Sequence, residues 1–190
     1  MKSFCLVLVS VLVFLTVSPS AAGAVISEKL LNQAGLSTVW QSAIALNAGE
    51  NVQRIDILGD YLYILTDTNY LFCLDRNTGK LSFAVTIALP RMPVSAPSFY
   101  KNTAYIVAAN KLIAFDIQHG IEIFRVLLHT PVSGAAAANG SYIYLPGMDK
   151  RLHVMNPNGE HEIFKATADN VSGVTSVLAT DAFVIFATDG

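Results

Sequence analysis

Residues 61–83, YLYILTDTNYLFCLDRNTGKLSF, decide the fold of this chain. Three runs of apolar and aromatic residues alternate with two polar turns, one beginning at Thr66 and the other running from Asp75 to Gly79. Strand-forming runs bounded by such turn residues predict strand, hairpin, strand, hairpin and strand. The stretch therefore predicts an antiparallel sheet made from consecutive chain segments.

The same pattern returns twice more along the chain. The turn from Asp75 to Gly79 recurs 41 residues later and again after a further 40, the last copy being one residue shorter. A tyrosine-rich run precedes each turn, and an aromatic residue follows it. The turn positions are Asp75, Gly79, Asp116, Gly120, Asn156 and Gly159, and the aromatic series is Trp40, Phe83, Phe124 and Phe164.

A period near 41 with about four short strands per unit is typical of a β-propeller. We predict an all-β chain of four-stranded antiparallel blades over residues 37–190, with three whole blades and parts of others. The turn glycines supply a positive φ, and Asp75 and Asp116 accept backbone N–H bonds within their own turns. Each aromatic residue is expected to fill the seam between neighbouring blades and to bury roughly 150–250 Å².

Both ends of the repeat region carry incomplete units. Residues 38–46 are predicted to form the outermost strand of a unit, and residues 188–190 match the start of a hairpin. Unpaired strand edges are an aggregation hazard. We therefore expect the chain to be a fragment of a seven- or eight-bladed propeller; the alternative is a natural stop at Gly190.

The N-terminus has the pattern of an export signal. Lys2 precedes an apolar run from Phe4 to Val17, and small residues 22–24 offer a cleavage site after Ala24. The alternative is an uncleaved anchor. Residues 25–36 predict one short helix, with Ser27 at its start. Removal of residues 1–24 would leave Cys73 as the sole cysteine, buried in an apolar strand, so no internal disulfide can form.

The repeats resemble those of PQQ-like β-propellers, in which a tyrosine-rich strand is followed by a Leu-x-Ala-Leu-Asp strand, a Thr-Gly turn and a tryptophan. Residues 71–79, LFCLDRNTG, are the nearest match, and phenylalanine replaces the tryptophan everywhere except at Trp40. The resemblance implies one of two classes of protein. One is the quinoprotein dehydrogenases, which use PQQ and calcium; the other is non-enzymatic propellers such as the BamB-like scaffold.

This chain resembles the non-enzymatic branch. Quinoprotein dehydrogenases carry adjacent cysteines and stack a tryptophan on the quinone, whereas this sequence has no cysteine pair and its only tryptophan fits the seam series. We expect an exported, non-catalytic scaffold of the periplasm or cell envelope that binds protein partners and uses no cofactor. The alternatives are the N-terminal part of a PQQ-dependent oxidoreductase and a binder of small ligands in the central channel.

No residue pattern indicates catalysis. The four histidines lack metal-ligand spacing, and the turn after Asp75 has its glycine one position too early for a calcium loop. A formal net charge of −2 without a basic run argues against a nucleic-acid partner. Loops such as residues 90–93 and 149–151 form the rims of a propeller, where binding sites are usually found.

Overall fold

The computed structural model describes residues 26–167 and 173–188, and the predicted export signal lies outside this part. The chain divides into two units, residues 1–38 and 39–190. In the first, helix α1 covers Glu28–Gln33 with Ser27 at its N-cap, and Gly35 follows with φ 68°. The Ser27 side chain makes no capping hydrogen bond. Among the described residues, no helix has the length and apolar character that crossing a membrane requires.

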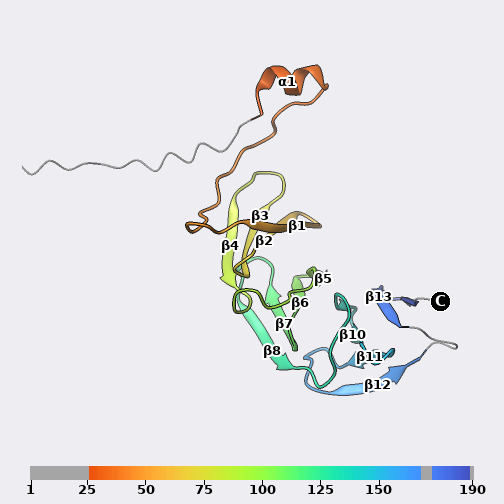
Figure 1. Cartoon of the computed structure of the whole chain (residues 1–190). Coiled ribbons are helices and arrows are strands. Elements are labelled where there is room, and N and C mark those ends of the chain that lie inside the picture. Colours follow the sequence, from red (N-terminus) through yellow and green to blue (C-terminus); the bar gives the residue numbers. More distant parts are fainter. Residues whose placement is uncertain (1–25, 168–172, 189–190) are drawn as a thin grey trace, which may run out of the picture. The chain divides into compact units, whose positions relative to one another are not determined.

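The second unit contains successive antiparallel sheets, as predicted (Figure 1). Each of the first three has four strands in chain order and is called a blade here. Blade 1 comprises β1 (Val52–Leu58), β2 (Tyr61–Thr66), β3 (Tyr70–Asp75) and β4 (Leu81–Thr86); blade 2 comprises β5 (Ser98–Tyr100), β6 (Thr103–Ala108), β7 (Lys111–Asp116) and β8 (Glu122–Leu127); blade 3 comprises β9 (Ala137–Ala138), β10 (Ile143–Pro146), β11 (Leu152–Met155) and β12 (Glu162–Ala166). A two-stranded sheet follows, β13 (Val174–Ala179) and β14 (Val184–Thr188).

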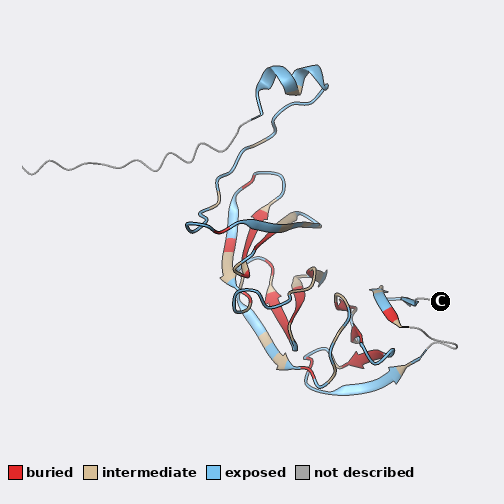
Figure 2. Cartoon of the chain, viewed as in Figure 1, coloured by how far each residue is buried: buried red, intermediate tan, exposed pale blue. Residues whose placement is uncertain are grey.

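The middle two strands of each blade carry the core. β2 and β3 each contain four consecutive buried residues, and β10 and β11 are buried throughout (Figure 2). Unbroken apolar runs are expected where both faces of a sheet are covered. The outer strands β4, β8 and β12 are mostly exposed or half-buried, with Phe83 the buried residue among them.

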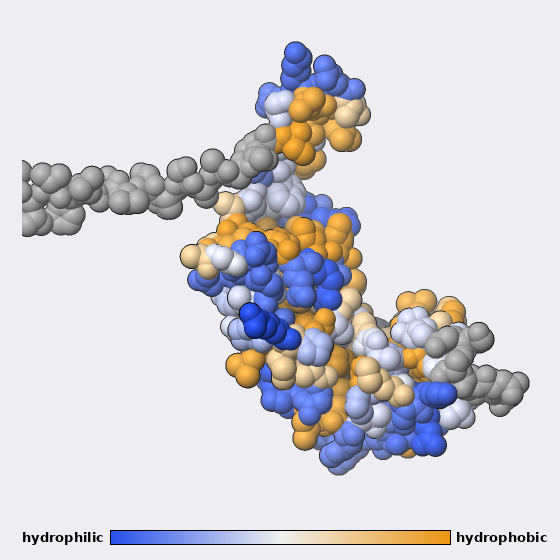
Figure 3. Space-filling view, viewed as in Figure 1, coloured by the Kyte–Doolittle hydropathy of each residue, from blue (hydrophilic) through white to orange (hydrophobic). Residues whose placement is uncertain are grey.

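Buried side chains join each blade to the next. One cluster combines Tyr63 and Cys73 of blade 1 with Ile106 and Phe115 of blade 2, and a second combines blades 2 and 3. Apolar side chains also reach the surface in patches beside charged ones (Figure 3). The core is therefore a chain of inter-blade clusters rather than one centre, as expected of repeats that bury their faces on one another.

The predicted strand at residues 38–46 is wrong. This segment is irregular and joins no ladder among the described residues. It is held by side chains instead: Ile44 packs against the cluster of Ile64, Phe72 and Leu74, and Trp40 lies against Gly79. A strand exists only where a neighbouring strand accepts its backbone hydrogen bonds, so strand-forming residues alone were a misleading signal.

Candidate functional site

The first two repeat turns share one hydrogen-bonding pattern. The Asp75 carboxylate accepts the N–H groups of Asn77 (2.9 Å) and Thr78 (2.8 Å), and the Asp116 carboxylate accepts those of Gln118 and His119. The pKa of Asp75 is lowered by its bonds from the Thr78 hydroxyl and amide. These aspartates hold their own turns, and the glycines that follow have φ near 68°.

Three of the aromatic residues lie against the turn glycine of the following repeat. Trp40 contacts Gly79, Phe83 contacts Gly120, and Phe124 lies 3.0 Å from the position of a Cβ on Gly159. The Trp40 indole also donates a 2.8 Å hydrogen bond to the Arg76 carbonyl. Phe164 differs, because its exposed ring (49%) meets Tyr142 of its own blade edge-on. A seam role for Phe164 stays a prediction.

A cavity of about 610 Å³ lies between blades 2 and 3 at one rim and is open to solvent. It is called the rim groove here. Two loops between blades, residues 93–96 and 131–135, supply most of its lining, and Val107, Ala109, Asn110 and Met148 complete it. The sequence indicated the rims, but not which pair of loops would face each other. Loops 38 residues apart in the chain adjoin only because the blades repeat.

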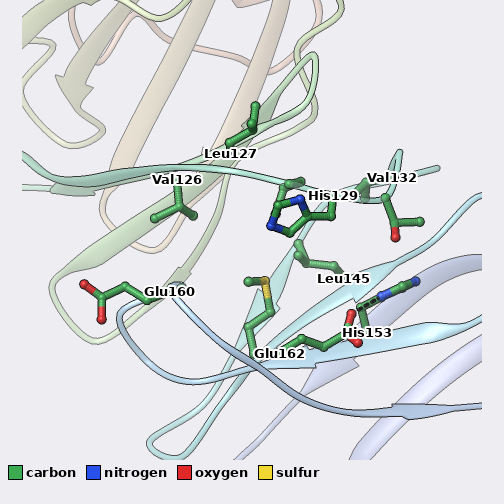
Figure 4. A pocket seen from close by; sticks show the side chains of 12 residues that line it. Val126, Leu127, His129, Val132, Leu145, His153, Glu160 and Glu162 are labelled. Carbon is green, nitrogen blue, oxygen red and sulfur yellow. Dashed lines mark hydrogen bonds and ion pairs between the residues drawn. The ribbon is translucent and has the colours of Figure 1, made fainter.

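A second cavity, of about 320 Å³, lies at the seam between β8 and blade 3 and is called the seam pocket (Figure 4). Val126 and Leu128 contribute from the end of β8, with Leu145 and Met155 from blade 3. Val132 lines both cavities. The polar lining residues His129 and Glu160 lie apart in Figure 4, whereas Glu162 is bonded to His153.

His153 is 4% exposed and lies between two carboxylates. Its Nε2 is 2.8 Å from Asp149 in the β10–β11 turn, and its Nδ1 is 2.5 Å from Glu162 in β12. Glu162 also pairs with Lys165 at 3.3 Å. Both ring nitrogens of His153 therefore lie within hydrogen-bonding distance of a carboxylate. Burial raises the pKa of Asp149 and Glu162, but the bonds and charge of His153 outweigh it, so both lie below their ordinary values.

Sequence reasoning missed this arrangement, although one signal was available. In the aligned repeats, His153 occupies the position of Phe72 and Ile113, which are both buried and apolar. A histidine at a position that is apolar in the other repeats could therefore have pointed to the cluster of His153, Asp149 and Glu162. His119 is exposed and bonds to Asp116 within its turn.

The Asn139 side-chain amide donates to the Tyr144 hydroxyl and the Thr180 carbonyl. Within residues 26–167 and 173–188, no three His, Cys, Asp or Glu side chains gather as a metal-binding group.

These features define a PQQ-like β-propeller repeat protein with an open cavity at a rim. The sequence matches the family described as outer membrane protein assembly factor BamB over residues 27–184. The chain belongs to this family. A search of curated proteins finds no match.

Solved structures share the fold at low sequence identity. BamB from Moraxella catarrhalis superposes with a TM-score of 0.56 at 16% identity, over 79% of this chain and 46% of that one. The designed protein Ika4 gives 0.58 at 15% identity over 80% and 92%, and the Pan2 WD40 domain of Neurospora crassa gives 0.56 at 13% over 74% and 44%. The chain therefore spans less than half the length of that BamB.

Proposed function

We propose that this chain is an exported, non-catalytic propeller that binds protein partners in the cell envelope and acts there as a scaffold. The observation that carries the proposal is the family match over residues 27–184, a family described by its part in outer-membrane protein assembly. The signal-like residues 1–24 support export. The uncharged rim groove between blades 2 and 3 supplies a surface that a protein partner could cover.

The architecture suits a scaffold for a physical reason. Each blade rests on its neighbour through buried clusters, so the loops at the rims are held by a rigid framework. Binding residues are commonly placed on loops that a rigid framework positions, because little conformational entropy is then lost when a partner binds.

Two measurements in the native host test the proposal. The full chain, tagged at its C-terminus, should be recovered from the envelope fraction shortened by the leader. Reversible cross-linking followed by quantitative mass spectrometry should then enrich the same envelope protein in replicate captures. A tagged, exported propeller of another family serves as the control. Recovery from the cytosol, or captures indistinguishable from the control, would refute the scaffold proposal.

The PQQ-dependent oxidoreductase alternative is tested separately by titrating the purified chain with PQQ and calcium. Quenching of Trp40 fluorescence with a saturable, stoichiometric end point would favour the oxidoreductase. An unchanged spectrum at equimolar and excess PQQ would favour the scaffold for the region present.

A further inference from the structure

The two walls of the rim groove repeat one pattern of backbone hydrogen bonds. In blade 2, Ala109 N–H donates to the Pro93 carbonyl and Ser95 N–H donates to Val107, both at 2.8 Å. In blade 3, Met148 N–H donates to Pro131 at 2.9 Å and Ser133 N–H to Pro146 at 2.8 Å. Each loop is thus tied to the turn of its own blade. A preformed groove loses little conformational entropy when it is occupied.

The lining of the groove is mostly apolar and carries no charged side chain; its polar members are Ser95, Asn110 and Ser133. Val94 and Val132 are half-buried, and Met148 is 66% exposed. The rim groove has a volume of about 610 Å³, which lies in the range typical of ligand sites, roughly 300–1,000 Å³. Burial of these side chains by apolar groups is favourable at about 25 cal/mol per Å² of area removed from water.

The amides of Ala96 and Ala135 belong to opposite walls of the groove, just before strands β5 and β9, and donate to no acceptor among the described residues. Extended peptides are commonly held by main-chain hydrogen bonds, with side-chain pockets giving specificity.

Three cationic side chains and one carboxylate lie within two residues of the lining. Arg91, Lys111 and Lys150 are exposed, and each is one or two residues from a lining residue. None of the three forms an ion pair within the described part of the chain. The acidic residue on the same turns, Asp149, is held by His153. A partner with negative charge on either side of its apolar segment would complement this arrangement.

We propose that the rim groove binds an extended, apolar segment of a partner protein that carries Asp or Glu residues at its flanks. The inference rests on the proposed scaffold function and adds the location of the site and the chemistry of the segment.

A selection from a library of random twelve-residue peptides tests the inference without knowledge of the partner. The full chain is immobilised, and enriched peptides are synthesised and measured by fluorescence anisotropy. We expect the enriched sequences to share an apolar centre with acidic flanks and to bind with Kd on the order of micromolar, as expected of short peptide sites.

Two groove variants and two matched controls locate the binding. Met148→Glu and Lys111→Glu place a like charge at the groove and should weaken binding about 10-fold or more each. Lys80→Glu repeats the Lys-to-Glu exchange in the turn after β3, and Ile121→Glu replaces an exposed apolar side chain in the turn after β7. Neither residue lines the groove, and both variants should change Kd by less than about 2-fold. All four positions are exposed, and unchanged thermal unfolding confirms that each variant is folded.

The inference is overturned if no peptide is enriched, if the enriched peptides are basic, or if Met148→Glu and Lys111→Glu bind them as wild type does. Capture of a partner from the envelope fraction distinguishes a failure of this inference from a failure of the scaffold proposal. If the groove variants still capture the envelope partner, the scaffold stands and the groove is not its site. If wild type captures none, the scaffold itself fails.

Discussion

The ring of Phe83 lies against the Cα of Gly120, so that a Cβ on Gly120 would occupy the space of the ring. Phe83 ends its own repeat, and Gly120 closes a turn in the next. Gly120 therefore meets two requirements at once. Its backbone adopts a positive φ of 67° in its own turn, and its missing side chain leaves room for the Phe83 ring of the preceding blade. Trp40 and Gly79 repeat this relationship one unit earlier.

We expect Gly120→Ala to destabilise the fold by about 2–4 kcal/mol. Roughly 1 kcal/mol comes from a side chain at positive φ, and about 1–3 kcal/mol from displacement of the buried Phe83 ring. Urea unfolding followed by circular dichroism measures the change. Gly49→Ala is the matched control, because Gly49 also has positive φ (81°) but has no atom within 4 Å of its Cβ position. Equal losses in the two variants would contradict the ring contact.

Acid should weaken the fold through the carboxylates that hold His153. The pKa values of Asp149 and Glu162 are lowered in the folded chain, so their contribution is complete above the ordinary carboxyl values and is lost as pH falls through the folded values. The free energy of unfolding should therefore begin to fall as the pH drops below about 5. Glu162→Gln should flatten this part of the profile.

The control for that profile is Glu122→Gln. Glu122 holds in blade 2 the register position that Glu162 holds in blade 3, but it pairs with Arg125 and faces no histidine. Glu122→Gln should leave the fall of the unfolding free energy at acid pH unchanged. His153→Leu restores the apolar residue of the other repeats but leaves Asp149 and Glu162 without their partner, so it should lower stability at neutral pH by about 1–3 kcal/mol. A steep acid slope in His153→Leu would show that the histidine is not its origin.

A second acid-sensitive contact lies before β1. Glu50 is buried, and its carboxylate accepts bonds from the Thr68 hydroxyl and from the Asn47 amide and side chain. Hydrogen bonds from the hydroxyls of Thr66 and Thr68, and then from Asn47, lower the pKa of Glu50 to about 2. Its contribution is present above pH 4.5 and lost toward pH 2, so Glu50→Gln should lower the urea midpoint at pH 7 but not at pH 2. Glu28→Gln, on exposed α1, is the control, and a shift persisting at pH 2 would contradict the explanation.

Cys73 should resist alkylation in the folded chain. It is fully buried, and burial raises the pKa of its thiol to about 12, although a hydrogen bond with Tyr63 acts in the opposite direction. In a Cys5→Ser background, iodoacetamide should label Cys73 at least about 100-fold more slowly than a Thr78→Cys, Cys73→Ser variant, because only opened molecules expose the thiol. Equal rates would show that blades 1 and 2 separate readily.

The repeat allowed the fold to be predicted from the sequence because its signals are local. Turn residues at 75–79 and 116–120 fix the hairpins, and the apolar runs between them specify strands buried on both faces. Three blades of four strands are observed where the period placed them. Local preference was insufficient at residues 38–46, where no described strand provides backbone partners and Trp40 and Ile44 anchor the chain by packing.

The candidate sites were decided by tertiary structure alone. The sequence determined that rims and turns would exist, that the aromatic series would recur and that no catalytic motif was present. Only the stacking of blades brings the loops at 93–96 and 131–135 to one groove, and only the β10–β11 turn and the β11–β12 ladder bring Asp149 and Glu162 to the two nitrogens of His153. Strand patterns are set by neighbours along the chain, whereas cavities and charge clusters depend on distances between segments that the chain order does not specify.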